Sequence, residues 1–198
     1  MKRLTALGAL LLAGCVNLGN LGESPAITYY VLEDSAAVER APAPDPRTLL
    51  LLDTQTAAFY DTTNLAFART PATRGQYQFA HWTERPGKRI TELLRTRLAA
   101  WGGFAGVAVA GGPIRGDLLL DTRLVEFYHD VATPPGSVRV TLDAELVDLA
   151  TRSLVARKRF EHRAAVADAS AEGAAAGFDR ATAAVLDELV AWLAAQRK

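Results

Sequence analysis

The sequence contains little cysteine and histidine, the residue types on which many catalytic and metal sites depend. Its single cysteine is Cys15, so the chain cannot form an intramolecular disulfide. The three histidines, His81, His129 and His162, are far apart in the sequence and lack the spacing of metal ligands. There is no Gly-x-Ser-x-Gly motif, and the glycines of 102–116 lack the Gly-Lys-Ser/Thr ending of a phosphate loop. We therefore predict no catalytic residue, no metal site and no cofactor.

The chain also lacks an excess of either charge, with 22 Lys and Arg residues against 22 Asp and Glu residues. Proteins that bind nucleic acid normally present a basic face, and polybasic membrane segments need clustered cations. After residue 14, no apolar run approaches the roughly 20 residues of a membrane-spanning helix. We therefore expect no nucleic-acid partner and a single near-neutral globular domain.

The first fifteen residues combine a basic, an apolar and a small-residue segment. Lys2 and Arg3 precede an apolar run over 4–12, which is too short to span a bilayer. Ala13, Gly14 and Cys15 follow, and this order resembles the lipobox of bacterial lipoproteins. The resemblance implies cleavage before Cys15 and acylation of its thiol. The alternative is an ordinary secretory signal followed by an incidental thiol.

Lipidation at Cys15 would hold the mature chain on a membrane, because each buried methylene adds about 0.8 kcal/mol and such lipoproteins carry three acyl chains. Val16 stands where an aspartate would favour retention at the inner membrane, so the resemblance favours the outer membrane. We assign 1–14 to the signal peptide, 15–26 to a lipidated tether and 27–198 to one periplasmic domain. The turn-forming residues of 16–26 would span roughly 35 Å when extended at about 3.3 Å per residue.

The domain sequence predicts strands, one helix, further strands and a last helix. β-Branched, aromatic or continuously apolar segments favour strands at 27–32, 48–52, 64–69 and 76–80, the last two forming a hairpin. Pro86 suits the first position of a helix that ends at Gly102-Gly103. Its apolar stripe contains Ile90, Leu94 and Leu98, and its solvent side is expected to contain Arg89, Arg95 and Arg97.

Three long strands are predicted at 117–130, 137–149 and 153–166, where turn residues separate segments of alternating hydrophobicity. They should form an antiparallel meander with 153–166 at its edge. An alanine-rich helix is predicted over 169–196, with Ser170 as its N-cap. The fold class is therefore α+β, a mainly antiparallel sheet with two principal helices packed on one face.

Three aromatic residues are candidates for contact with a partner or a lipid. Tyr29 and Tyr30 are adjacent in one strand, so they must point to opposite faces of the sheet, and one of them should lie away from the core. Trp82 precedes the Pro86 helix and could present its indole to a partner; the alternative is that it closes one end of the core. Glu126, Tyr128 and Asp130 could share a strand face as a weak cation site, or simply form a solvated strand end.

The order of several motifs resembles a known family. Residues 29–32 (Tyr-Tyr-Val-Leu), Tyr77, residues 82–86 (Trp-Thr-Glu-Arg-Pro) before a leucine-rich helix, and residues 124–127 (Leu-Val-Glu-Phe) before the meander are similar to the ABC-type transport auxiliary lipoproteins, the PqiC-like family. The resemblance covers nearly the whole mature chain. It implies an outer-membrane lipoprotein that serves an MCE-domain system for moving lipid between two membranes, with an MCE-domain protein as partner and self-assembly into a homo-oligomeric ring. Residues 59–63 depart from the Leu-Pro-x-Tyr-Leu pattern of the better-known branch.

The leading hypothesis is a non-enzymatic docking component of such a system, with no cofactor other than the lipid on Cys15. A lipid-binding receptor or shuttle is its closest variant and would need an apolar pocket. The alternative from another class is a lipoprotein that regulates a periplasmic cell-wall synthase. If the protein is a docking component, its deletion should alter the membrane lipid balance. If it regulates a cell-wall synthase, its deletion should cause a peptidoglycan defect.

Overall fold

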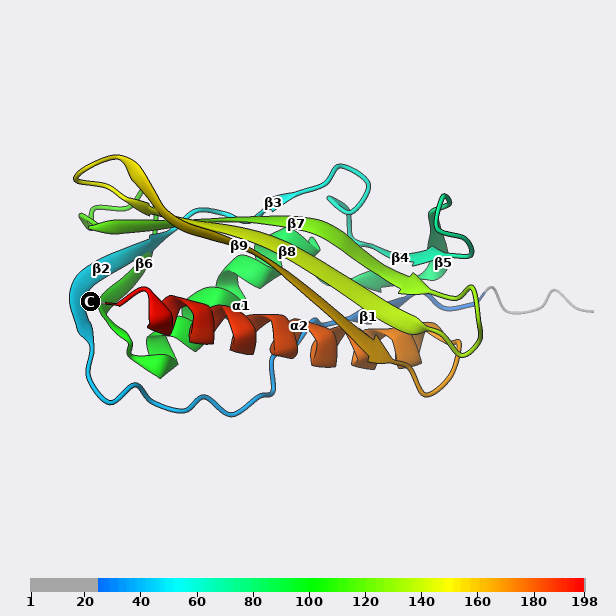
Figure 1. The fold of residues 1–198 in the computed structure, drawn as a ribbon. Helices are drawn as coiled ribbons and strands as arrows, with labels where there is room; N and C mark the ends of the chain where they lie inside the picture. Colours follow the sequence, from blue (N-terminus) through cyan, green and yellow to red (C-terminus); the bar gives the residue numbers. More distant parts are fainter. Residues whose placement is uncertain (1–24, 198) are drawn as a thin grey trace, which may run out of the picture.

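The computed structural model describes residues 25–197, so Cys15 and most of the tether lie outside the described residues. Residues 25–197 form a sheet of nine strands and two helices (Figure 1). The strands are β1 (Thr28–Tyr30), β2 (Asp45–Leu51), β3 (Gln55–Thr56), β4 (Asn64–Ala68), β5 (Gly75–Trp82), β6 (Phe104–Val109), β7 (Leu118–Asp130), β8 (Ser137–Asp148) and β9 (Ser153–Ala165). The helices are α1 (Pro86–Trp101) and α2 (Ala171–Ala195). The predicted α+β class is confirmed.

The long strand β7 organises the sheet. On one side it begins the predicted antiparallel meander β7–β8–β9, in which β9 is an edge strand that pairs with β8 and with no other described strand. Its other side is shared along its length by three short parallel neighbours, β2 near its start, β3 in the middle and β4 near its end. β6 continues the sheet beyond β2, while β5 and then β1 continue it beyond β4. The antiparallel pairings are the longest, but the short parallel ones were not predicted.

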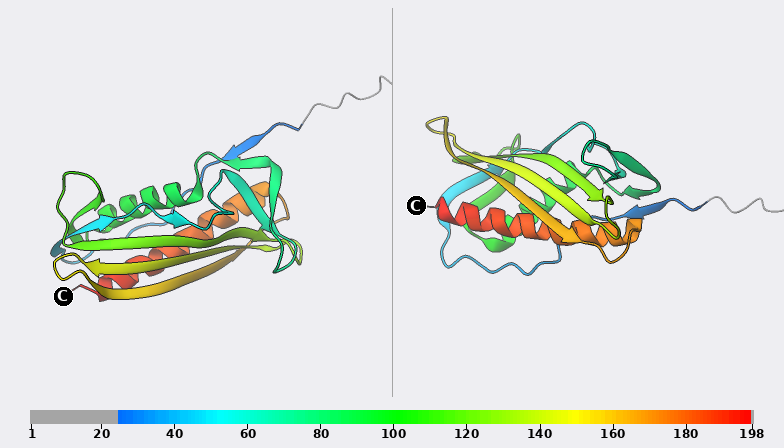
Figure 2. Two further views of the ribbon diagram at one scale, coloured as in Figure 1. Left: turned by 90° about the horizontal axis from the view of Figure 1, so that it is seen from above. Right: turned by 45° about the vertical axis from the view of Figure 1, so that its right-hand side comes forward.

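The meander follows the alternation in the sequence. Val138, Val140 and Leu142 of β8 are almost completely buried, as are Ala144 and Leu146, and all five face the core. The intervening Arg139, Asp143 and Glu145 lie on the opposite face and are at least partly accessible. This arrangement is expected of an antiparallel sheet with one face covered. The views of Figure 2 show the meander wrapping along α2.

Both helices begin and end where the sequence predicts. Pro86 occupies the first turn of α1, and Gly102 ends the helix with a φ of 64°, a conformation that favours glycine. At α2, the Ser170 side chain accepts a hydrogen bond from the Gly173 N–H at 2.9 Å. A Cβ on Gly177 would lie 3.1 Å from Val138, so glycine allows α2 to approach β8 closely. Neither helix is both long enough and apolar enough to cross a bilayer.

The two helices and the inner face of the sheet share one hydrophobic core, which confirms that both helices pack on the same face (Figure 1). Its aromatic centre contains Trp82 of β5, Phe127 of β7 and Phe178 of α2. The rings of Phe127 and Phe178 stack with centroids 4.2 Å apart, and Trp82 lies 5.7 and 5.3 Å from them. Residues distant in sequence are therefore held together by aromatic packing.

The solvent position predicted for the arginines of α1 holds for Arg95 and is wrong for Arg97. Only 2% of Arg97 is exposed, because the connector between β1 and β2 passes over this face of the helix. Arg97 Nε donates to Asp34 Oδ2 at 2.6 Å, and the guanidinium also pairs with Asp187 of α2. Burial alone would lower the pKa of Arg97, but its bonds to Asp34 raise it above the usual value. The sequence pattern gave no sign of this pair.

Candidate interaction surfaces

The predicted contact residues Tyr29 and Tyr30 lie in β1 and point in opposite directions, as expected. Tyr29 is 63% exposed, and its ring lies 5.7 Å from that of His81 on the neighbouring strand β5. Tyr30 is half-buried and packs against the core. Its carbonyl accepts a hydrogen bond from the Thr83 N–H at 2.9 Å, which extends the pairing of β1 with β5. Of the two tyrosines, Tyr29 is the one presented to solvent.

Tyr29 belongs to a larger surface that we call the β1 apolar face, formed by Ile27, Tyr29, Val31 and Phe79. Ile27, Tyr29 and Val31 are every second residue of 27–31, and their exposed fractions are 53, 63 and 47%. Phe79 of β5 is 37% exposed and alternates with the buried Ala80 and Trp82. Large apolar side chains gathered in this way commonly mark a site of contact with a protein or a membrane.

Trp82, the third predicted contact residue, is not part of this surface. Only 2% of it is exposed, and it packs in the aromatic centre of the core. Direct contact between Trp82 and a partner is therefore not supported, and the structure shows the alternative in which the indole belongs to the core. Its Nε1–H is buried and has no hydrogen-bond partner among residues 25–197.

Replacing Trp82 with phenylalanine should lower the free energy of unfolding by less than about 2 kcal/mol, because loss of ring volume is offset by removal of an unpaired donor. Urea unfolding monitored by circular dichroism would measure the change. Trp101→Phe is the matched control, since Trp101 is 5% exposed and has no comparable unpaired donor. A larger loss at Trp82 than at Trp101 would contradict this explanation.

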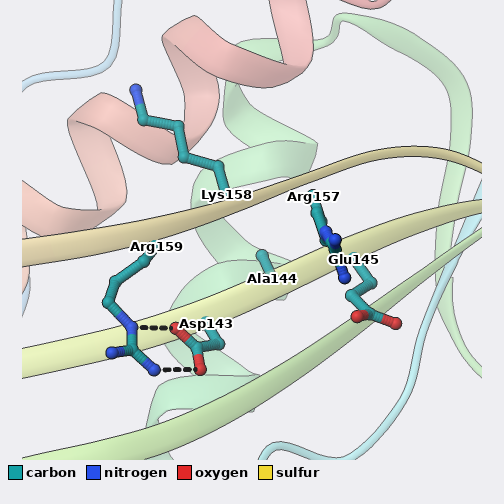
Figure 3. Close-up of a pocket in the computed structure, with 6 residues that line it drawn as sticks. All are labelled: Asp143, Ala144, Glu145, Arg157, Lys158 and Arg159. Carbon is teal, nitrogen blue, oxygen red and sulfur yellow. Dashed lines mark hydrogen bonds and ion pairs between the residues drawn. The ribbon is translucent and has the colours of Figure 1, made fainter.

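The outer face of the meander, which is turned away from the two helices, has a regular pattern of charges. Asp121, Glu145 and Arg157 form one cross-strand row, and Arg123, Asp143 and Arg159 form the next. Figure 3 shows the shallow hollow between β8 and β9, where Arg159 binds Asp143 through two hydrogen bonds of 2.6 and 2.8 Å. These bonds hold the pKa of Asp143 below its usual value. Exposed pairs of this kind contribute little stability and form a hydrated surface.

Lys158 lies between these arginines in sequence but points to the other side of the sheet, toward α2 (Figure 3). Its Nζ lies 2.8 Å from Glu188 Oε1, and His162 Nε2 lies 2.8 Å from the other oxygen of the same carboxylate. Hydrogen bonding to Lys158 lowers the pKa of Glu188. Lys158 and His162 therefore connect the edge strand β9 to α2, while Arg157 and Arg159 lie on the outer face of β9.

The weak cation site considered for Glu126, Tyr128 and Asp130 is not supported. Glu126 accepts hydrogen bonds from Arg139 at 3.2 Å and from Thr141 at 3.1 Å, so its charge is already paired. Tyr128 is buried, and the guanidinium of Arg74 lies 4.0 Å from its ring centre. Across residues 25–197, no group of three His, Cys, Asp or Glu side chains could hold a metal ion.

His129, which follows Tyr128 in β7, is a fully buried titratable residue. Its Nδ1 lies 2.9 Å from the Tyr77 hydroxyl, and its Nε2 lies 3.1 Å from the Pro135 carbonyl oxygen. The carbonyl can only accept, so Nε2 carries a proton and Nδ1 accepts from the tyrosine in the neutral ring. Burial lowers the pKa of His129 because it disfavours the charged form.

This buried histidine should make the fold less stable in mild acid. Below the ordinary histidine pKa of about 6.5 the unfolded chain takes up a proton that folded His129 resists, so stability falls until the pH drops below the folded-state pKa. Urea unfolding measured between neutral and mildly acidic pH should show this loss, and His129→Gln should reduce its slope. An unchanged slope in the variant would show that His129 is not responsible.

A second group of exposed apolar residues lies next to the β8–β9 turn and in the loop between β6 and β7. Leu154 and Val155 of β9 are 50 and 40% exposed, and Ile114 in the loop before β7 is 56% exposed. Leu154 continues a cross-strand row with Val147 and Leu119. We call Ile114, Leu154 and Val155 the hairpin-end residues. The β8–β9 turn next to Leu154 and Val155 lies at the end of the domain away from β1 (Figures 1 and 2).

These features define a two-layer α+β domain with two groups of exposed apolar residues, the β1 apolar face and the hairpin-end residues. The family model of the ABC-type transport auxiliary lipoprotein component matches residues 30–190, and the chain belongs to this family. The family resemblance noted in the sequence is thereby confirmed. The chain is thus a lipoprotein component of the cell envelope, auxiliary to an ABC-type transport system.

Solved structures show the same fold. A protein from Xanthomonas campestris, assigned to the DUF330 family, is similar with a TM-score of 0.78 and 24% identity, over 85% of this chain and 95% of that one. A hypothetical protein from Chlamydia trachomatis has a TM-score of 0.51 and 9% identity, over 76% of this chain and 97% of that one. A search of curated proteins found no match.

Sequence reasoning found Tyr29 but missed the rest of the β1 apolar face. Ile27 and Val31 have the same parity as Tyr29, so their alternation was a usable signal. Phe79 gave no comparable signal, because the pairing of β1 with β5 joins segments about fifty residues apart and is parallel.

Proposed function

We propose that the chain is an outer-membrane-anchored, non-enzymatic docking component of an MCE-type system that moves lipid between the two membranes. The observation that carries this proposal is the match of residues 30–190 to a lipoprotein component of ABC-type transport. The lipobox at Cys15, followed by valine, supports the anchor and favours the outer membrane.

The shape of the domain suits a docking role. β1 lies at one end of the elongated sheet, while the β8–β9 turn, which precedes the exposed Leu154 and Val155, lies at the other end (Figure 1). A domain tethered through Cys15 would stay within a few tens of ångströms of the membrane, which raises its effective concentration for a partner that crosses the periplasm. An MCE-domain protein is the partner that we propose.

A lipid-carrying role would need an apolar pocket large enough for an acyl chain. The charged side chains of the hollow in Figure 3 are those of Asp143, Glu145, Arg157 and Arg159, and Ala144 is its one apolar residue; Lys158 also borders it, but its side chain points toward α2. Charged walls do not favour an acyl chain. The larger hollow between the β1–β2 connector and α2 has Val38, Trp101 and Val190 in its lining, but also the charged Arg97, Asp187 and Arg197. Docking needs only a surface, and the exposed apolar residues provide one.

Deletion of the protein in its own host tests this function. The proposal predicts sensitivity to detergents and an altered balance of membrane lipids, with normal peptidoglycan. Wild-type protein should restore both properties, and Cys15→Ser protein should not. A peptidoglycan defect with unchanged lipids would instead support the regulator of a cell-wall synthase.

A further inference from the structure

We propose that the β1 apolar face, formed by Ile27, Tyr29, Val31 and Phe79, rests on the lipid surface to which the chain is anchored. This inference deepens the proposed function and rests on its lipid anchor at Cys15. The anchor alone would leave the orientation of the domain free. Contact between this face and the bilayer would fix it.

The first argument is the lack of charge. Residues 25–32 and 75–83, which contain β1 and β5, include no Asp, Glu, Lys or Arg. The outer face of the meander, by contrast, has two cross-strand rows of charged side chains. A surface that enters the headgroup region should avoid fixed acidic groups, because anionic lipids repel them.

The second argument is the kind of side chain that is exposed. The solvent side of β1 and β5 carries three rings, those of Tyr29, Phe79 and His81. The rings of Tyr29 and His81 lie 5.7 Å apart. Amphipathic aromatic rings concentrate at the boundary between water and hydrocarbon in membrane proteins. Ile27 and Val31 provide purely apolar area on either side of Tyr29.

The third argument is the position of this face in the chain. Ile27 is the twelfth residue after Cys15, and twelve extended residues reach at most about 40 Å. Only one charged residue, Glu23, lies between Cys15 and Glu33. Because the anchor makes the second contact intramolecular, a surface of a few apolar side chains can hold the orientation even though it would bind membranes weakly by itself.

A lipid surface fits this face better than a second copy of the chain. Pairing with another strand would require an edge of useful length, and β1 has only three residues. The long unpaired edge of the sheet is β9, whose Arg157, Lys158 and Arg159 discourage pairing. The β8–β9 turn, which precedes Leu154 and Val155, lies at the end of the domain away from β1 and so stays free for a partner (Figures 1 and 2).

The mature lipidated protein, reconstituted in liposomes of phosphatidylethanolamine and phosphatidylglycerol, tests the inference. Cys15 is the only natural cysteine, so once it is acylated a thiol introduced at Val31→Cys or at Leu154→Cys can be labelled uniquely with a fluorophore. A nitroxide lipid then quenches the reporters that lie at the membrane. We expect several-fold stronger quenching at position 31 than at position 154. Tyr29→Glu in the Val31→Cys protein should reduce the quenching, and Ile114→Glu should not.

Equal quenching at the two positions would overturn the inference, as would disulfide-linked dimers of the Val31→Cys protein, which would assign this face to a second copy. Failure of the anchor itself is distinguishable. In that case protein without an introduced cysteine would take up the fluorophore at Cys15 and would not sediment with the liposomes.

Discussion

Replacing Arg97 with methionine should lower the free energy of unfolding by about 3–5 kcal/mol, the usual cost of removing one partner from a buried ion pair. The variant would leave Asp34, whose side chain is 8% exposed, without its cation. The guanidinium also joins α1 to Asp187 of α2, so its loss would loosen the contact between the helices and the connector.

Arg95→Met is the matched control on the same helix. Arg95 pairs with Glu92 at 2.9 Å, but 45 and 44% of their side chains are exposed, so its loss should cost less than about 1 kcal/mol. Urea unfolding of both variants, each in a Cys15→Ser background that avoids detergent, gives the comparison. Similar losses at the two positions would show that the buried pair is not important to stability.

Replacing Cys15 with serine should abolish membrane anchoring, because a hydroxyl cannot take the place of the acylated thiol in lipoprotein maturation. The protein should move from the membrane fraction to the released periplasmic fraction, and its mass should lack the lipid. Cys15 lies outside residues 25–197, so the domain should keep its unfolding midpoint.

Ser24→Ala is the matched control, since it changes a tether residue without touching the acylation site. Fractionation followed by intact-mass spectrometry measures both proteins. Native lipid on the Cys15→Ser protein, or retention of that protein in the membrane, would show that Cys15 is not the anchor.

The sequence predicted those parts of the fold that depend on local patterns. Pro86, Gly102 and Ser170 act on their own helix ends, and the alternation in β8 records which of its faces is buried. The meander strands follow one another in the chain, so their antiparallel pairing could be inferred from their turns.

The features that were missed depend on residues far apart in the sequence. Asp34 lies 63 residues before Arg97, and helical periodicity alone placed that arginine in solvent. The parallel pairing of β2 with β6 and β7 has no turn signal. For Trp82, residue type left both interpretations open, and only the packing against Phe127 and Phe178 placed it in the core.

In-cell crosslinking of the Cys15-anchored protein tests the central claim most directly. A photoreactive residue would replace Leu154, which is exposed at the end of the domain opposite β1, and the crosslinked partners would be identified by mass spectrometry. We predict recovery of an MCE-domain protein, with loss of that product in Cys15→Ser protein. Recovery of a cell-wall synthase without any MCE-domain protein would contradict the transport function.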